Sequence, residues 1–195
     1  MTTQVKFWPV PRGFTRRLPG RSATGSFWKW RGDRHHCGVD LFAPAGSPVL
    51  AIESGKVVRR GHFTSPLTRA YWNRTFFVLI RHESGVVARY AELGKVLVRT
   101  GQRVTAGQQI GVVGRVLNPK RADSSTPPYI RKMISKRRVS MLHFELYSAP
   151  ARDSKEYSGG NWFARGKPPK LLDPSDYLRS ALQPKSRFSS ARVPF

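Results

Sequence analysis

Short runs of β-branched and aromatic residues, interrupted by Gly and Pro, constrain the fold of this chain more than any other feature. They cover residues 48–52, 56–58, 75–81, 85–90, 96–99, 109–113 and 140–147. Runs of this length with turn residues between them are typical of strands in a sandwich or barrel, whereas a βαβ fold needs longer helical segments between its strands. We therefore expect an all-β domain with a compact antiparallel β-sandwich or barrel-like structure.

This β-rich pattern occupies the middle of a 195-residue chain and predicts one domain over residues 34–148. Residues 1–33 are rich in Pro, Gly, Arg and aromatic side chains without a steady period, which predicts an irregular basic N-terminal arm. Residues 115–139 form a basic insertion before the last predicted strand, and loops of that length are usually functional or disordered. Residues 149–195 form a basic C-terminal extension.

One short helix is expected near residues 173–182 of this extension. Asp173 is a suitable N-cap, and Pro174 fits the first helical position. The segment after it, residues 183–195, is predicted to be a basic tail.

The chain carries 35 Lys and Arg residues against 11 Asp and Glu residues, a formal net charge of +24. Such a field attracts nucleic acid, anionic wall polymers or acidic protein partners, and it exceeds the charge of about 2–8 that solubility asks of a small domain. One cluster in the insertion either contacts a polyanion or forms a solvated loop: Arg131, Lys132, Lys136, Arg137 and Arg138.

Some features bear on where the protein acts. No apolar run approaches the roughly 20 residues of a membrane-spanning helix, and residues 1–9 lack the pattern of a signal peptide. Cys37 is the sole cysteine, so no internal disulfide can form, and we interpret it as small strand filler. A protein that acts on the cell wall would then reach it by lysis or on a phage-like particle, and would otherwise stay in the cytoplasm.

Two segments offer metal-ligating side chains. Because residues i, i+2 and i+4 of a strand point the same way, His36 and Asp40 would project together, with Gly38 leaving room for an ion. Imidazole and carboxylate groups suit zinc, although a lone strand histidine is often structural. In the last predicted strand the apolar face is expected to pack into the core, which turns His143 toward the opposite, site-bearing face. That apolar face comprises Leu142, Phe144 and Leu146.

A series of motifs runs in order between residues 35 and 147. They are His36-x-Gly-x-Asp40, Ala43–Val49, Gly55–Val57, Val78–His82, Tyr90–Leu93, Gly101–Gly111 and Leu142–Glu145. As an ordered set they resemble the lysostaphin/LytM-type zinc endopeptidases, a family of peptidoglycan hydrolases. The resemblance covers neither terminal arm.

This resemblance implies a LytM domain of the duplicated hybrid motif type with a substrate groove. It also implies that His36, Asp40 and His143 bind Zn²⁺ and that the protein hydrolyses peptide bonds of peptidoglycan. Three protein ligands leave a fourth position for water, whose pKa falls to about 7 on zinc. Glu145 would either orient a ligand imidazole or form a plain salt bridge on the strand face.

Two positions depart from the family pattern, which commonly has a histidine at each. They hold Glu92 and Met141, and methionine can neither accept a proton nor donate a useful hydrogen bond. In one interpretation Glu92 is the general base and Tyr90, on the same strand face, donates to the oxyanion. In the other, Glu92 is an ordinary carboxylate and the site binds metal without effective turnover.

These observations give two hypotheses. In the first, the protein is a zinc metallopeptidase that cleaves peptide cross-bridges of peptidoglycan, its charge favours approach to anionic wall polymers, and a phage tail or virion carries it. In the second, a catalytically weak or inactive LytM-like domain is a structural or binding module of a larger assembly. Its basic arms would then contact nucleic acid or neighbouring subunits.

Overall fold

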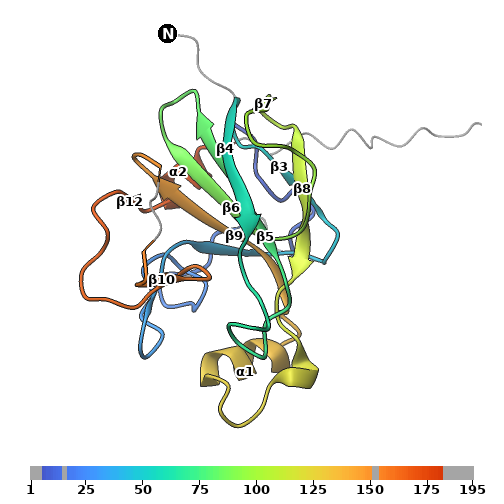
Figure 1. The fold of residues 1–195 in the computed structure, drawn as a ribbon, viewed down its shortest axis with the longest axis vertical. Coiled ribbons are helices and arrows are strands. Elements are labelled where there is room, and N and C mark those ends of the chain that lie inside the picture. The colour runs from blue at the N-terminus through green and yellow to red at the C-terminus, as the bar shows by residue number, and fades with distance from the viewer. Residues whose placement is uncertain (1–5, 15–16, 151–153, 182–195) are drawn as a thin grey trace, which may run out of the picture.

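A computed structural model gives the structure of the protein and describes residues 6–14, 17–150 and 154–181. Its main feature is a curled nine-stranded antiparallel sheet in the order β12-β9-β8-β6-β5-β4-β7, with β2 beside β9 and β3 beside β8 (Figure 1). The strands are β2 (Val39–Phe42), β3 (Pro48–Leu50), β4 (Gly55–His62), β5 (Phe76–His82), β6 (Val87–Val96), β7 (Arg103–Val104), β8 (Gln109–Arg115), β9 (Ser140–Tyr147) and β12 (Leu171–Leu172). A second, small antiparallel sheet contains β1 (His35–His36), β11 (Asn161–Trp162) and β10 (Tyr157–Ser158). The prediction of an all-β antiparallel domain is confirmed.

The two faces of the main sheet pack differently. Alternate residues of β9 are buried in the largest apolar cluster, which confirms the predicted core face of Leu142, Phe144 and Leu146. Each such side chain contributes about 1.5–3 kcal/mol by its burial. The opposite face carries a smaller apolar cluster that includes Cys37 and Ala91, and the same face bears His143. This second face therefore holds the candidate site.

Both terminal regions pack against this sheet. The N-terminal arm adds Trp8 and Val10 to the main core, and the backbone of Phe7 donates to the Ile52 carbonyl over 2.9 Å. The C-terminal region adds β12 and the buried Leu178. Neither packing contact was predicted from the sequence, because neither produces a periodic pattern of its own.

The C-terminal helix differs from its prediction. Helix α2 (Ser175–Arg179) begins later and ends earlier than residues 173–182, and Asp173 accepts a hydrogen bond from the Ser175 backbone instead of capping a longer helix. The predicted tail, residues 183–195, lies outside the described residues.

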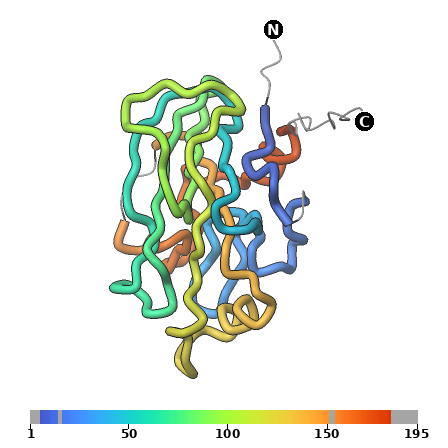
Figure 2. The backbone as a smooth tube through the Cα atoms, turned by 90° about the vertical axis from the view of Figure 1, so that its right-hand side faces the viewer, coloured from blue at the N-terminus to red at the C-terminus, as the bar shows by residue number. Residues whose placement is uncertain are grey.

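The insertion contains a helix that was predicted as loop. A 3₁₀ turn, η1 (Pro119–Arg121), precedes α1 (Pro128–Ser135), whose Ile130 and Met133 are buried. Helix α1 lies at the end of the sheet away from β7 (Figures 1 and 2).

The prediction of a strand at residues 96–99 is wrong, since only Val96 belongs to a strand, where it ends β6. Neither α1 nor α2, the α-helices of the described part, is long and apolar enough to cross a membrane.

Candidate metal centre

Three strands bring the candidate ligands together. His36 ends β1, Asp40 lies in β2, and His143 lies opposite Asp40 in the β2–β9 register. The Oδ1 atom of Asp40 lies 3.0 Å from both His36 Nε2 and His143 Nδ1, and these two nitrogens are 3.0 Å apart. All three side chains are buried, so the site is built into the sheet.

Hydrogen bonds on the far side of each ring set the imidazole tautomers. His36 Nδ1 lies 2.9 Å from the Ser26 carbonyl oxygen, which can only accept, so Nδ1 carries the proton. His143 Nε2 donates likewise to Glu145 Oε1 over 2.8 Å. In the neutral rings, His36 Nε2 and His143 Nδ1 therefore carry lone pairs. These lone pairs and Asp40 Oδ1 converge on one point.

Three converging acceptors need a positive charge between them. Burial alone would lower the pKa of His143, but hydrogen bonds to Asp40 and Glu145 outweigh it and raise the pKa to about 9. Burial lowers the pKa of His36 to about 4. One proton on His143 thus partly neutralises the cluster, and a divalent cation would do so more fully. The donor set, two imidazole nitrogens and one carboxylate oxygen, fits zinc and is the one group of three such residues in the described chain.

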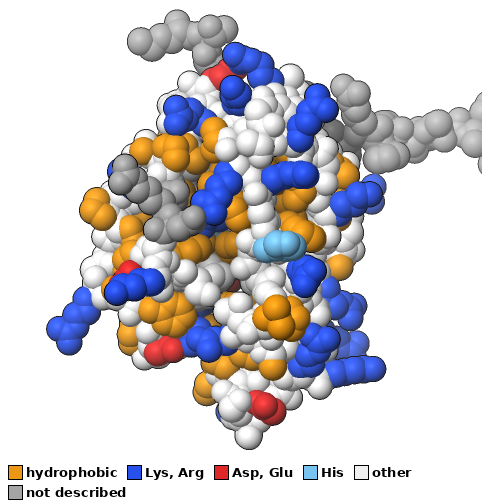
Figure 3. All heavy atoms as spheres, viewed as in Figure 1, with side chains coloured by type: hydrophobic (Ala, Val, Ile, Leu, Met, Phe, Trp, Pro, Cys, Tyr) orange, Lys and Arg blue, Asp and Glu red, His pale blue; other side chains and the backbone are white. Residues whose placement is uncertain are grey.

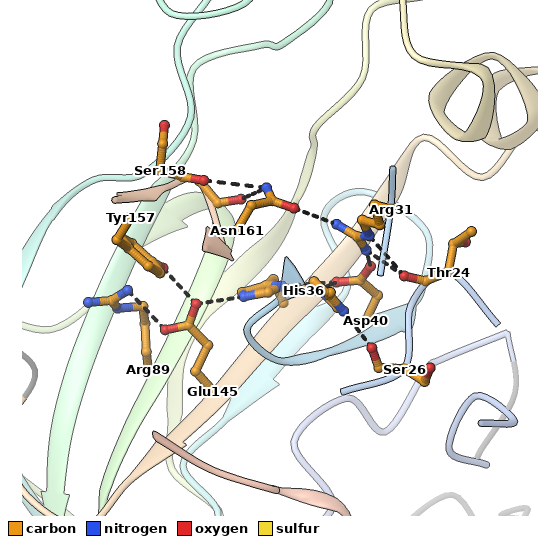
Figure 4. A network of polar contacts seen from close by, with 12 residues as sticks. Thr24, Ser26, Arg31, His36, Asp40, Arg89, Glu145, Tyr157, Ser158 and Asn161 are labelled. Atoms are coloured by element: carbon orange, nitrogen blue, oxygen red, sulfur yellow. Dashed lines mark hydrogen bonds and ion pairs between the residues drawn. The ribbon is translucent and has the colours of Figure 1, made fainter. Parts of the chain in front are cut away.

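Glu145 anchors the His143 ring from behind. Its Oε1 accepts from His143 and, over 2.6 Å, from the Tyr157 hydroxyl, while Oε2 accepts from Arg89 over 2.9 Å and from the Tyr147 hydroxyl. Burial would raise the pKa of Glu145, but the charge of Arg89 and the His143 hydrogen bond lower it to about 2. The two roles considered for Glu145, orienting an imidazole and forming a salt bridge, are thus both present in its contacts (Figure 4).

The role expected for Gly38 is wrong. A Cβ atom at this position would lie 2.3 Å from the Phe144 carbonyl oxygen and 3.0 Å from His143 Cε1. The glycine is therefore needed for close approach of the chain to β9, and it does not make space for an ion.

Glu92 reaches the site through an irregularity in β6. Its φ angle is +62°, and the β5–β6 and β6–β8 registers both shift beside it. Burial and the charge of Asp40 raise the pKa of Glu92 to about 8, against the opposing charges of His143 and Arg31. Its Oε2 is buried and has no hydrogen-bond partner among the described residues. A buried carboxylate oxygen without a donor, beside the ligand cluster, is another acceptor that fits a cation or a bound water.

The structure contradicts the role that strand alternation predicted for Tyr90. Tyr90 was placed on the same face as Glu92, but the register shift separates them, and Tyr90 lies in the main core, where its hydroxyl contacts the Ile52 backbone amide at 2.9 Å and His82 Nε2 at 3.0 Å. It is no oxyanion donor. Met141 is buried in an apolar cluster with side chains of α1. Side chains of the insertion therefore pack around this substituted position.

Arg31 is a site residue that the sequence analysis missed. Its Nη2 donates to Asp40 Oδ2 over 3.0 Å and to the Thr24 carbonyl over 2.6 Å, and its Nη1 donates to Asn161 Oδ1 over 3.0 Å. The guanidinium also lies over the Tyr129 ring of α1. Arg31 therefore leaves Asp40 Oδ1 free to face the imidazoles. No local pattern marks it among 35 basic residues.

Segments on both sides of the domain cover the site. A Cβ atom on Gly160 would lie 2.5 Å from His143 Cε1, and one on Gly25 would lie 2.9 Å from Asp40 Cβ. The Phe63 ring lies 5.5 Å from the His143 ring. The arm before β1 and the β10–β11 hairpin thus pack directly on two ligands.

The predicted polyanion cluster divides into two parts. Arg131 and Lys132 are exposed on α1, whereas residues 136–138 follow the helix and line a cleft that reaches Asp40. Figure 3 shows Lys and Arg side chains spread over one face of the molecule, with few acidic side chains among them.

Comparison with known proteins assigns the chain to a family. The model of peptidase family M23 matches residues 34–154. The chain is 37% identical over 87 residues to the peptidoglycan DD-endopeptidase ShyA of Vibrio cholerae, covering 43% of this chain and 18% of ShyA. It is 30% identical over 104 residues to the murein hydrolase activator NlpD of Salmonella dublin, covering 48% of this chain and 26% of NlpD.

Among solved structures, lysostaphin from Staphylococcus simulans shares the fold, with a TM-score of 0.55 and 22% identity over 100% of this chain and 61% of lysostaphin. The chain thus spans less than a third of the length of both curated relatives. The family match confirms the resemblance to the lysostaphin/LytM-type proteins, and the matched segment contains all three candidate ligands. The chain belongs to peptidase family M23.

Proposed function

We propose that this protein is a zinc-dependent peptidase that hydrolyses peptide cross-bridges of peptidoglycan. The observation that carries the proposal is the convergence of His36 Nε2, Asp40 Oδ1 and His143 Nδ1 within hydrogen-bond distance of one another. Zn²⁺ bound there would polarise the scissile carbonyl and lower the pKa of a water molecule. The similarity to a peptidoglycan DD-endopeptidase supports the substrate class.

In this proposal, other residues of the chain position the ligands and supply a general base. Ser26 and Glu145 hold the two imidazoles in their metal-binding tautomers. Arg31 holds Asp40 by its outer oxygen. Glu92 is the general base in this proposal, because its carboxylate is buried beside the ligands and its Oε2 lacks a protein donor in the described structure. Carriage of the protein to the wall by lysis or on a phage-like particle stays a prediction.

Zinc content and muropeptide release test the proposal together. Purified protein should contain about one zinc ion per chain, and His36→Ala should remove it. Glu92→Gln should retain zinc but lose about 10²–10⁴-fold in turnover, the usual effect of removing a general base. Asp176→Asn is the matched control, since this carboxylate is exposed on α2. Wild-type protein that binds no zinc would refute the proposal, and unchanged turnover in Glu92→Gln would refute the assignment of the base.

A second function is favoured by a different observation. Met141 is buried against α1 instead of offering a polar group, the ligands are covered, and the similarity includes a murein hydrolase activator. The protein would then bind metal and act as an activator or structural module. Zinc binding without release of muropeptides would identify this function.

A further inference from the structure

A cleft beside the candidate metal centre is lined mainly by basic and apolar side chains. It has a volume of about 450 Å³, within the roughly 300–1,000 Å³ of small-ligand sites. Its lining comes from the N-terminal arm, from β2 and from the turn after α1: Phe14, Arg17, Pro19, Gly20, Ala23, Thr24, Gly25, Asp40, Phe42, Lys136, Arg137 and Arg138. We call it the basic cleft. Because Asp40 is a candidate ligand, the cleft lies directly beside the proposed reaction centre.

The charges of the basic cleft are unbalanced. Four of its lining residues are cationic, and Asp40, the one acidic residue among the described lining, is already paired with Arg31. Arg17, Lys136, Arg137 and Arg138 form no ion pair within the described ranges of the chain. An anion entering the cleft would therefore find donors that are not engaged by a carboxylate of the protein.

The backbone after α1 fixes where these cations lie. The amides of Arg137 and Arg138 donate to the Ile134 and Met133 carbonyls, each over 2.9 Å. Arg137 has a φ angle of +55°, which turns the chain sharply. The Arg138 guanidinium lies 5.1 Å from the centre of the Phe42 ring. The turn therefore presents its charges to the cleft in a defined arrangement.

We propose that the basic cleft recognises a free carboxylate of the substrate peptide beside the scissile bond, so that the protein prefers cross-bridge peptides with an acidic residue to neutral ones. This inference rests on the proposed function. Arginine pairs with carboxylates through strong charge-assisted hydrogen bonds, and Phe14, Pro19 and Phe42 offer apolar contact to neighbouring methyl groups. A single compact cleft suits one peptide carboxylate better than a polyanionic strand, which needs an extended basic track.

Binding to two peptides that differ by one charge tests the inference. The probes are Ala-Glu-Ala-Ala and Ala-Gln-Ala-Ala, both with blocked termini, titrated calorimetrically into full-length Glu92→Gln protein loaded with zinc. We expect the acidic peptide to bind about tenfold more tightly, as one charge-assisted hydrogen bond allows. The double variant Lys136→Gln/Arg137→Gln should abolish this preference.

The matched control is Arg131→Gln/Lys132→Gln, which removes the same two residue types from the exposed side of α1, the helix that precedes the turn. It should keep the preference. Equal affinity of the Glu92→Gln protein for both peptides, equal loss when either double variant is added to it, or tighter binding of an oligonucleotide that depends on Lys136 and Arg137 would overturn the inference. If the Glu92→Gln protein shows the preference and wild-type protein releases no muropeptides, the cleft is supported and the proposed function alone is refuted.

Discussion

Glu92 shows how a single backbone angle decides from which face of a sheet a side chain projects. Along β6, Ala88 and Tyr90 pack into the main core while Val87 and Ala91 pack on the other face. The left-handed φ of Glu92 breaks this alternation, so Leu93 returns to the core and the carboxylate joins the site. A non-glycine residue in this conformation costs about 1–2 kcal/mol, which the surrounding sheet must offset.

The protonation of His143 predicts how the stability of the metal-free protein depends on pH. Its pKa is raised from 6.5 to about 9 in the folded state, so the stabilisation is complete below pH 6.5 and is lost as the pH rises through 9. The melting temperature of metal-free protein should fall over this range. Zinc-loaded protein should not show this fall, because its His143 is already neutral. Because the raised pKa of Glu92 adds a loss of stability that ends near pH 8, His143→Gln should flatten the profile above pH 8, and the exposed His62→Gln should leave the profile unchanged. A flat profile for metal-free wild type would contradict this.

Gly160 allows the hairpin to lie on the His143 ring. In Gly160→Ala the new Cβ would lie 2.5 Å from Cε1 of that ring, so we expect destabilisation by about 1–3 kcal/mol from overpacking and weaker zinc binding. Gly166→Ala is the control, since its φ of +76° nearly equals the +77° of Gly160 but nothing lies within 4 Å. Denaturant unfolding and zinc titration compare the two variants. Equal losses in both would show that backbone strain, not contact with His143, is responsible.

At the scale of elements, the sequence predicted the strands that have a clear periodic pattern. The alternation in residues 140–147 correctly separated the apolar face of β9 from the face bearing His143. Helix α1 was missed because its run of apolar and basic residues, 130–134, is short and lies in a segment rich in Pro and Ser. Tyr90 was misplaced because a strand irregularity shifts the alternation without leaving a signal in the residue types. Arg31 was missed because its contacts come from tertiary packing.

The helix α1 and strand β9 meet at Met141, and this contact predicts the effect of restoring a histidine. Met141→His would place a polar ring in a cluster with Ile130 and Met133, so we expect a loss of about 1–3 kcal/mol in stability and no gain in turnover. Met141→Leu keeps the apolar contact and should be close to neutral. Thermal unfolding and muropeptide release measure the two effects. A Met141→His protein with wild-type stability and higher turnover would contradict this expectation.

At the scale of the whole molecule, Arg31 connects parts of the chain that are far apart in the sequence. It joins the N-terminal arm, the β10–β11 hairpin and Asp40 through the contacts of one guanidinium. In the chain as a whole, the cover over the site therefore depends on residues on both sides of the family-matched segment, residues 34–154.

Removing this connection should loosen the cover. Arg31→Gln leaves Asp40 Oδ2 without its charged donor, which costs about 1–3 kcal/mol, and we expect faster amide exchange in residues 157–162 and faster loss of zinc to a chelator. Arg21→Gln removes an exposed arginine of the same arm and should change neither rate. Hydrogen exchange detected by mass spectrometry and chelator kinetics measure them. Unchanged rates in Arg31→Gln would show that the cover is held by other contacts.

His36 and His143 meet although 107 residues separate them along the chain. During synthesis, a nascent polypeptide that has emerged only as far as α1 possesses the first imidazole and Asp40 but lacks the third ligand. Closing so long a loop is also entropically slow. A zinc ion bound by all three ligands could therefore not template the early stages of folding, and its binding would follow assembly of the sheet.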